Sequence, residues 1–293
     1  MAIPLISWLV PGHDDRADLA VLMVSWNVKD LVLKNLEALF ASEGSLKAEV
    51  IVMDNASRDA TVEAVRERFP QVRVIANTFN AGFSLANNQG LMVKYARHVL
   101  LLNPDMRVEP DALQKTVDYL DAHPEAGVVG ARLVASDGSI VPHVRRFPTF
   151  GSQLAILLKL PHFFPHLIDH YLAKDFDDAR EQAVDSVRGS YFAMHERALE
   201  RCAGLDTRYF IWFEEVDYCK KVAEQGMKVV YVPTIRATDF VGRSFAQRES
   251  FWKQKQFTRS MVQYFEKWHP WWQTWILKTV RLFVLTGVWV VSH

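Results

Sequence analysis

The stretch HVLLLNPDMRVEP, residues 98–110, decides the fold. It begins as an apolar run typical of a buried strand and stops abruptly at Asn103, Pro104 and Asp105. Proline stiffens a turn and restricts the backbone of the residue before it. The pattern therefore predicts a strand that is fixed in a rigid sheet and holds the Asp105 carboxylate in a defined place at its end.

Similar apolar runs precede this one and alternate with helix-like segments. Fully apolar strands that are separated by helices favour a parallel sheet covered on both faces. We therefore expect an α/β fold, with a Rossmann-like, mainly parallel sheet flanked by helices. The expected strands are 19–25, 49–54, 72–76 and 98–103, and the expected helices between them are 28–41, 58–69 and 84–96.

Polar residues follow each expected strand, at the edge where such sheets bind ligands. They occur in SWN (25–27), DNAS (54–57), NTFNAGFS (77–84) and NPD (103–105). Asn27 and Ser57 also stand where they could cap the helices that follow. Gly82 permits a tight backbone turn near a ligand. Asn87, on the next helix, either contacts that ligand or only ties the loop together.

Composition excludes some classes of function. The formal net charge is +0, from 34 basic and 34 acidic residues, so no global electrostatic argument for nucleic-acid binding exists. The two cysteines, Cys202 and Cys219, are too few for a disulfide framework and suit a reducing compartment. The hydrophobic content of 49% is ample for a large core.

The segment 151–184 is apolar, aromatic and broken by proline, which favours an insert that acts as a lid or faces a membrane. His162, His166 and His170 are four residues apart, as metal ligands on a helix can be, but Pro165 interrupts the run. We regard a metal site here as the weaker interpretation.

The C-terminal segment Trp271 to Val291 is long enough to span a membrane, but Lys278 and Arg281 near its middle disfavour a span. On a helix these charges share a face with Thr274, opposite a face led by tryptophans. The pattern favours an amphipathic helix in a membrane interface, and the alternative is a helix docked on the protein's own core. We expect an N-terminal arm (1–18), a catalytic domain (19–268, divided at 130) and this helix (269–293).

Together, several motifs resemble those of the family-2 inverting glycosyltransferases of the A-type fold, in the bacterial rhamnosyltransferase-like branch. The resemblance covers about residues 19–268. The motifs are VSWN (24–27), VMDNASRD (52–59), FNAGFSLANNQG (79–90), LLLNPD (100–105), RGSYFAMHERAL (188–199), GLDTRYFIWFEEVDYCKKV (204–222) and VVYVP (229–233).

The resemblance implies a pyrimidine-nucleotide sugar as donor, either dTDP-L-rhamnose or a UDP-sugar. Asp54 would accept the N3–H of the base. Arg243 and Ser244 would contact the diphosphate, although Arg243 could equally be a solvated loop charge. The other donor-side residues are Ser25, Asn27, Asn55, Ser57, Gly82, Asn87 and Asn103, and the acceptor-side residues are Gly189 and Ser190.

The resemblance also implies Mg²⁺ or Mn²⁺ on the diphosphate. Asp105 corresponds to the last acid of the family's metal motif, and Asn103 replaces another acid of that motif. Asp239 stands where relatives place a metal-binding His. The general base would be Glu215, the second acid of the pair Glu214–Glu215, because inverting transfer needs a carboxylate to take the acceptor's proton.

The acceptor that we expect is a glycan or a polyprenyl-diphosphate-linked sugar. This acceptor and the C-terminal helix lead us to expect a cytoplasmic protein that is peripheral on the inner face of the cell membrane. The alternative from another class is a catalytically silent protein of the same fold that acts as a membrane scaffold. The oligomeric state stays open.

Overall fold

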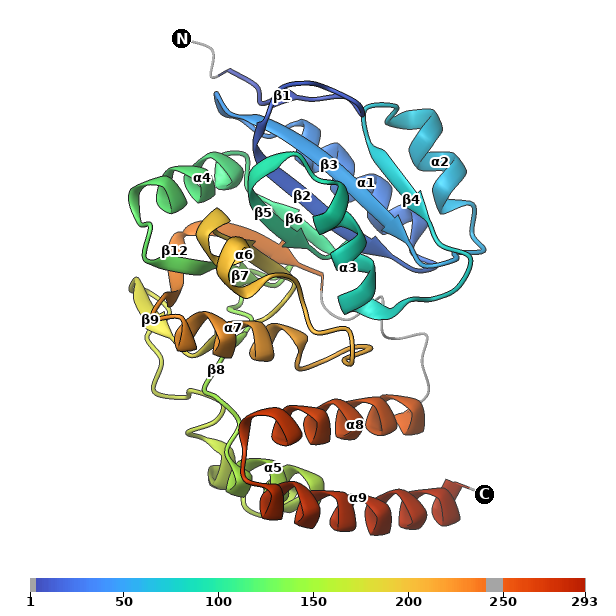
Figure 1. The fold of residues 1–293 in the computed structure, drawn as a ribbon, viewed down its shortest axis with the longest axis vertical. Helices are drawn as coiled ribbons and strands as arrows, with labels where there is room; N and C mark the ends of the chain where they lie inside the picture. Colours follow the sequence, from blue (N-terminus) through green and yellow to red (C-terminus); the bar gives the residue numbers. More distant parts are fainter. Residues whose placement is uncertain (1–3, 241–249, 293) are drawn as a thin grey trace.

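A computed structural model describes residues 4–240 and 250–292 of the chain. Within these residues, ten strands form one twisted sheet with helices on both faces, and two further helices form a separate layer below it (Figure 1). The predicted α/β fold is thus confirmed. The predicted Arg243 and Ser244 lie outside the described residues.

The first half of the sheet follows the sequence prediction to within a few residues. Its strands pair in parallel, in the order β4, β3, β2, β5. The strands are β2 (Ala17–Ser25), β3 (Lys47–Asp54), β4 (Arg73–Ala76) and β5 (Ala96–Leu102), and the helices are α1 (Lys29–Phe40), α2 (Thr61–Arg68) and α3 (Gly82–Val93). In the expected N-terminal arm, β1 (Ser7–Trp8) adds a parallel partner to β3.

The second half makes the sheet mixed. β11 (Tyr191–Met194) lies antiparallel between β5 and β7 (Ala126–Val134), and β12 (Lys228–Asp239) runs parallel to β7. β6 (Met106–Val108) and β9 (Gln182–Val184) pair antiparallel with β12. The helices of this half are α4 (Ala112–Ala122), α6 (Glu196–Cys202) and α7 (Glu214–Glu224).

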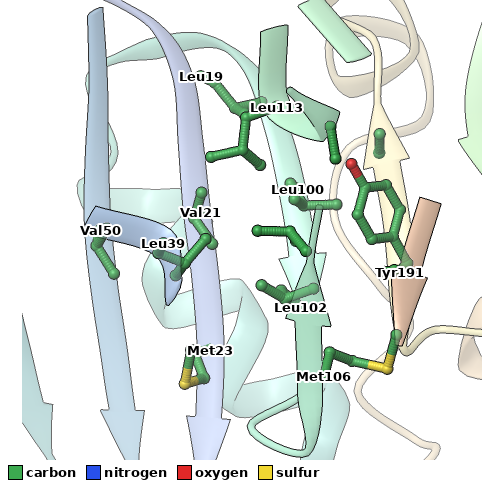
Figure 2. Packing of buried hydrophobic residues seen from close by; sticks show 14 of the residues in the cluster. Leu19, Val21, Met23, Leu39, Val50, Leu100, Leu102, Met106, Leu113 and Tyr191 are labelled. Atoms are coloured by element: carbon green, nitrogen blue, oxygen red, sulfur yellow. The ribbon is translucent and has the colours of Figure 1, made fainter. Parts of the chain in front are cut away.

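Alternate strand residues face two separate cores. Leu19, Val21, Leu100 and their neighbours pack against Leu39 of α1 and other residues of α1, α2 and α4 (Figure 2). The intervening residues pack under α3, α6 and α7. Full burial of one such side chain contributes about 1.5–3 kcal/mol, so the apolar strands hold their polar ends rigidly.

A two-stranded ribbon lies outside the main sheet. Its strands are β8 (Val144–Arg145) and β10 (Ser186–Val187), which pair antiparallel. The chain between them forms α5 (Phe150–Leu157) and two short 3₁₀ turns, Leu160–His162 and Pro165–Ile168. His162, His166 and His170 are exposed, and the described residues hold no group of three potential metal ligands, so this weaker metal interpretation has no structural support.

The last two helices pack on each other and on α5. α8 (Ser250–Trp268) packs on the start of α7 and the loop before it through a third core, which contains Phe213, Tyr264 and Leu277. α9 (Trp271–Ser292) lies along α8 and beside α5 (Figure 1). No helix in the described ranges combines the length and the apolar content that a membrane crossing requires.

α9 turns Thr274 and Arg281 toward the protein, whereas Lys278 lies at the surface. Thr274 is buried, the Arg281 guanidinium donates to the Thr258 hydroxyl of α8 at 2.9 Å, and Lys278 pairs with Glu266 at 2.7 Å. Trp271 is 80%, Trp275 63% and Phe283 70% exposed. The helix is therefore docked on the protein, as the alternative prediction held, and its aromatic face points to solvent.

The two predicted helix caps are wrong. α1 begins after Val28 and α2 after Ala60, and neither helix has a side-chain cap. Asn27 has a φ of 53°. The backbone N–H of Asn27 donates a hydrogen bond to the Ser57 hydroxyl at 2.8 Å. The Asn27 side chain in turn accepts from Arg58 N–H at 2.7 Å. These side chains join two strand-end loops because the parallel strands β2 and β3 bring those loops together.

Candidate active site

A pocket of about 540 Å³ opens beyond the carboxyl ends of β2, β3 and β5. This is the edge of the sheet at which the sequence predicted a ligand. Aromatic rings from the 210–213 loop and from α8 form much of its wall. The predicted site residues that line it are Ser25, Asn55, Gly82, Asn103, Asp105, Gly189, Ser190, Glu214, Glu215 and Asp239.

Several buried polar atoms of the pocket lack a protein partner. The hydroxyls of Ser25 and Ser190, and one carboxylate oxygen each of Glu214 and Glu215, are buried without a hydrogen bond. Leaving such a group unpaired costs about 1–3 kcal/mol. Four orphaned atoms around one pocket indicate that a polar ligand completes them.

Gly82 is required by a close approach of two loops. Its φ is +79°, and a Cβ at this position would come within 2.4 Å of the Phe210 carbonyl oxygen. The same carbonyl accepts a hydrogen bond from Phe83 N–H at 2.7 Å. Asn55 supports this loop by donating to the Gly82 carbonyl at 3.0 Å. Gly82 thus joins the donor-side loop to the loop that precedes Glu214.

Four predicted residues do not line the pocket: Asn27, Asp54, Ser57 and Asn87. Asp54 is buried at the end of β3, opposite Ser25, and one of its oxygens accepts from Ser57 N–H at 2.8 Å. Its other oxygen has no partner. Asn87 donates to the Phe83 carbonyl at 3.0 Å, one helical turn earlier. This bond lies within α3, and the Asn87 side-chain oxygen is buried without a partner, so the ligand role of Asn87 stays a prediction.

Asp105 lies in the tight turn between β5 and β6. The turn is fixed from three sides: the Asn103 carbonyl accepts from Met106 N–H and from the Asn35 side chain, and Asn103 N–H donates to the Ser190 carbonyl. Asp105 itself is buried. The expectation that the turn holds this carboxylate rigidly agrees with these contacts.

Asp239 lies next to Asp105, although the two residues are 134 positions apart in the sequence. β12 pairs with β6 so that Asp239 stands opposite Met106, and Phe240 N–H donates to the Asp105 carbonyl. Both carboxylates are buried. Burial, and then the charge of Asp239, raise the pKa of Asp105.

The Asp105–Asp239 pair fits a hard divalent cation. Two buried carboxylates that repel each other are stabilised by a cation between them, and Mg²⁺ and Mn²⁺ prefer oxygen ligands. In the described residues the pair is not part of a larger cluster of potential ligands. A cation here would take its remaining ligands from phosphate and water.

Arg188, which the sequence analysis missed, contacts this pair. Its guanidinium lies 3.3 Å from the Asp239 carboxylate, and it lines the pocket. It also lowers the pKa values of Asp105 and Glu215. Its position in RGSYF, directly before the predicted acceptor-side residues, was the available signal.

Glu214 and Glu215 begin α7 after a strained turn. Trp212 and Phe213 both have positive φ, 65° and 71°, which is uncommon for large residues and costs about 1–3 kcal/mol each. Phe257 of α8 packs against both rings. The α8 packing therefore maintains the turn that directs the two glutamates into the pocket.

The two glutamates differ in their environment. Glu214 is buried, and burial and then the charge of Glu215 raise its pKa well above the ordinary value. Glu215 is half-buried; burial also raises its pKa, while Arg188 opposes the shift. Arg188 thus favours the ionised form of Glu215.

Gly189 and Ser190 both line the pocket. A Cβ at Gly189 would make only ordinary contacts, at 3.5 Å from the Phe83 ring and 3.8 Å from Glu215. The protein alone therefore does not require a glycine there.

The fold is the A-type fold of glycosyltransferases. The chain belongs to Glycosyl transferase family 2, whose family model matches residues 20–193. It is 29% identical, over 200 residues, to the N-acetylglucosaminyl-diphospho-decaprenol L-rhamnosyltransferase of Mycobacterium tuberculosis. That match covers 63% of this chain and 64% of the relative, so the chain spans less than two thirds of that relative's length.

Two more similarities extend over most of the chain. Rhamnosyltransferase WbbL of Escherichia coli is 22% identical over 256 residues, which are 83% of this chain and 92% of that protein. The mannosyltransferase PcManGT from Pyrobaculum calidifontis, solved with GDP-Man and Mn²⁺, has a TM-score of 0.60 at 18% identity. The similarity covers 96% of this chain and 73% of the mannosyltransferase chain, and it supports the fold.

Proposed function

We propose that this chain is an inverting, metal-dependent transferase that moves L-rhamnose from dTDP-L-rhamnose to a diphosphate-linked acceptor. The observation that carries the proposal is the position of Glu215, with an unpaired carboxylate oxygen, in the same pocket as the buried Asp105–Asp239 pair. A base and a charged leaving-group site in one pocket are what a single displacement needs.

In the proposed reaction, Glu215 accepts the proton of the acceptor hydroxyl. The oxygen attacks the anomeric carbon from the face opposite the diphosphate, and the bond from that carbon to the diphosphate oxygen breaks. The nucleoside diphosphate leaves with the electron pair, so one displacement inverts the anomeric centre. Glu214, which is the more deeply buried of the two acids, positions the acceptor or the loop.

Asp105 and Asp239 would hold Mg²⁺ or Mn²⁺. When bound, the ion would stabilise the negative charge of the departing diphosphate. Asp54 lies outside the pocket lining, but it has an unpaired carboxylate oxygen and stands beside Ser25 and Asn55, which line the pocket; we propose that this oxygen accepts the N3–H of thymine or uracil. A UDP-sugar fits the same contacts, so the experiment below includes both nucleotides.

The choice of sugar and acceptor rests on the relatives. The name of the Mycobacterium tuberculosis relative includes L-rhamnose and N-acetylglucosaminyl-diphospho-decaprenol. A polyprenyl acceptor is held in a membrane, and the aromatic face of α9 suits a membrane interface. We place the enzyme at the inner face of the cell membrane, in cell-wall or polysaccharide synthesis, with residues 19–268 as its catalytic domain.

A donor screen tests this function. The full chain is incubated with Mn²⁺, N-acetylglucosaminyl diphosphate on a short alkyl chain, and dTDP-L-rhamnose or UDP-sugars. We expect release of nucleoside diphosphate and a glycosylated product, and the metal-free reaction should be inactive. The absence of transfer with every donor would favour the silent scaffold instead.

Glu215→Gln provides the sharper test. The change removes the base but keeps the size of the side chain, so transfer should fall about 10²–10⁴-fold. Donor binding should stay unchanged. Glu224→Gln, at the far end of the same helix, is the matched control because Glu224 pairs with Lys220 at the surface. Retained turnover in Glu215→Gln would exclude Glu215 as the base.

A further inference from the structure

The β8–β10 ribbon gathers nitrogen-rich side chains on one face. Arg145 of β8 stands opposite Ser186 of β10 in the antiparallel register. Two residues further along the ribbon, the same register places His143 near Arg188. Because alternate residues of a strand share a face, these four side chains lie together. All four line the pocket, whereas Val144 is buried in the core and Arg146 pairs with Asp175 elsewhere.

Arg145 carries a charge that no acid neutralises. Its guanidinium donates to the carbonyls of Val144 at 2.7 Å and Pro142 at 3.4 Å. Within residues 4–240 and 250–292, no carboxylate lies within ion-pairing distance of it. Burial, with Arg188 adding to the effect, lowers the pKa of Arg145. A half-buried cation beside a second cation is unfavourable unless an anion binds there.

His143 provides a second, independent indication of a ligand. It is buried in the pocket wall, and neither ring nitrogen makes a hydrogen bond of ordinary geometry. Burial lowers the pKa of His143 to about 3, although the Ala131 carbonyl opposes the shift. The ring is therefore neutral near pH 7 and offers one donor and one acceptor without adding a positive charge.

Arg145, Tyr171 and Glu215 line the same pocket. The charge of Arg145 lowers the pKa of Tyr171, and the charge of Glu215 raises it. The cation that contacts the Asp105–Asp239 pair is instead Arg188, at 3.3 Å from the Asp239 carboxylate. The chain continues from Arg145 into α5, which packs beside α9 (Figure 1). An anion at Arg145 would therefore belong to the molecule that approaches Glu215 from the layer formed by α5 and α9.

We propose that Arg145, with His143 and Arg188 beside it, binds the phosphate of an acceptor whose sugar is carried on a diphosphate. The planar guanidinium fork matches a phosphate in a bidentate manner. This inference rests on the proposed function, since it names the class of acceptor for the same pocket. The donor diphosphate presents the same chemistry, so the experiment must distinguish the two sources.

Calorimetric titration of the full chain with octyl diphosphate tests the site without any transfer step. We expect Arg145→Gln to weaken binding about tenfold or more, because a hydrogen-bonded charge contact is lost. Arg145→Lys should weaken it by a smaller factor, because it keeps the charge and loses the fork. Arg146→Gln is the matched control and should bind like the wild type, because Arg146 pairs with Asp175 at the surface.

A second titration with UDP or dTDP and Mn²⁺ identifies the source of the phosphate. Unchanged nucleotide affinity in Arg145→Gln supports an acceptor site, and a parallel loss would assign Arg145 to the donor and overturn the proposal. Failure of the wild type to bind octyl diphosphate, or equal binding by Arg145→Gln, would also overturn it. If thermal unfolding shows that Arg145→Gln is not folded, both titrations are made with Arg145→Lys instead. Weaker octyl diphosphate binding with unchanged nucleotide affinity then supports the acceptor site, and any other result overturns it.

The two proposals can fail separately. A failed donor screen with intact octyl diphosphate binding contradicts the proposed transfer alone. Active transfer with unchanged octyl diphosphate affinity in Arg145→Gln contradicts the acceptor-phosphate site alone.

Discussion

At the scale of the residue, the ionisation of Glu215 controls the proposed chemistry. Burial raises its pKa above the ordinary value of 4.5, and Arg188 limits that rise. A carboxyl group with a raised pKa in the folded state favours folding at low pH, and this contribution is lost as pH rises through the folded pKa. The base, by contrast, acts only when ionised. Stability and activity therefore respond to the pH in opposite directions.

We predict that kcat/KM falls on the acid side with a midpoint above pH 4.5, measured as a pH–rate profile of the full chain. Arg188→Gln should move this midpoint to higher pH, because a cation that favours the ionised form is removed. Arg146→Gln removes an arginine that pairs at the surface and should not move it. A midpoint at or below 4.5 would contradict the role of Glu215.

Other residues act through neighbours that are distant in sequence. Asp239 was predicted from its place after VVYVP, and the pairing of β12 with β6 brings it beside Asp105. Arg188 and Arg145 were not predicted, because an isolated arginine in a sequence does not reveal which side chains face it. Their positions depend on the ribbon register and on the folding of the 151–184 segment between the strands.

At the scale of the element, α8 and α7 are joined by a buried carboxylate. Asp217, in the first turn of α7, is fully buried beneath α8. Lys267 lies 2.8 Å from its carboxylate, and the Trp268 indole N–H donates to it at 2.7 Å. Since α8 also packs on the strained turn before Glu214, this link stabilises the catalytic turn.

We predict that Asp217→Ala lowers the free energy of unfolding by about 3 kcal/mol or more, because a buried ion pair is broken. Urea denaturation measures the change. Asp175→Ala, which breaks the exposed pair with Arg146, is the control and should cost no more than about 1 kcal/mol. Equal losses in the two variants would show that the buried link contributes no more than a surface pair.

At the scale of the whole molecule, one apolar surface stands out. Trp271, Trp275 and Phe283 of α9 point to solvent, and the exposed Phe163 and Phe164 belong to the segment after α5. α5 contacts both α9 and the 3₁₀ turns, so these side chains belong to one layer at the end of the molecule opposite α2 (Figure 1). This layer, with the aromatic side chains outward, supports the proposed contact with a membrane surface.

We predict that the triple variant Trp271→Ser, Trp275→Ser, Phe283→Ser binds anionic lipid vesicles at least about tenfold more weakly, because it loses apolar area from the interface. Vesicle co-sedimentation measures this change. The matched control replaces Phe79, Met92 and Tyr95, which are also exposed, by serine. Equal sedimentation of both variants and the wild type would contradict membrane contact through α9.

Much of the fold could be predicted because its first half is built from local patterns. Each strand from β2 to β5 is an apolar run, and β2, β3 and β4 are each followed by a helix with its own periodicity. A parallel sheet then brings the polar strand ends to one edge, so Ser25, Asn55, Asn103 and Asp105 could be grouped without a structure. The resemblance to a family supplied the roles of Glu215 and Asp239.

The sequence by itself determined the α/β class, the edge of the sheet that binds the ligand and the acids that carry the proposed chemistry. Only the tertiary structure decided which side chains oppose one another across separate elements. It placed Arg188 at Asp239, grouped Arg145 with His143, and turned the polar face of α9 toward α8. Periodicity assigns a residue to one face of its own element, but the partner of that face depends on packing between segments far apart in the chain.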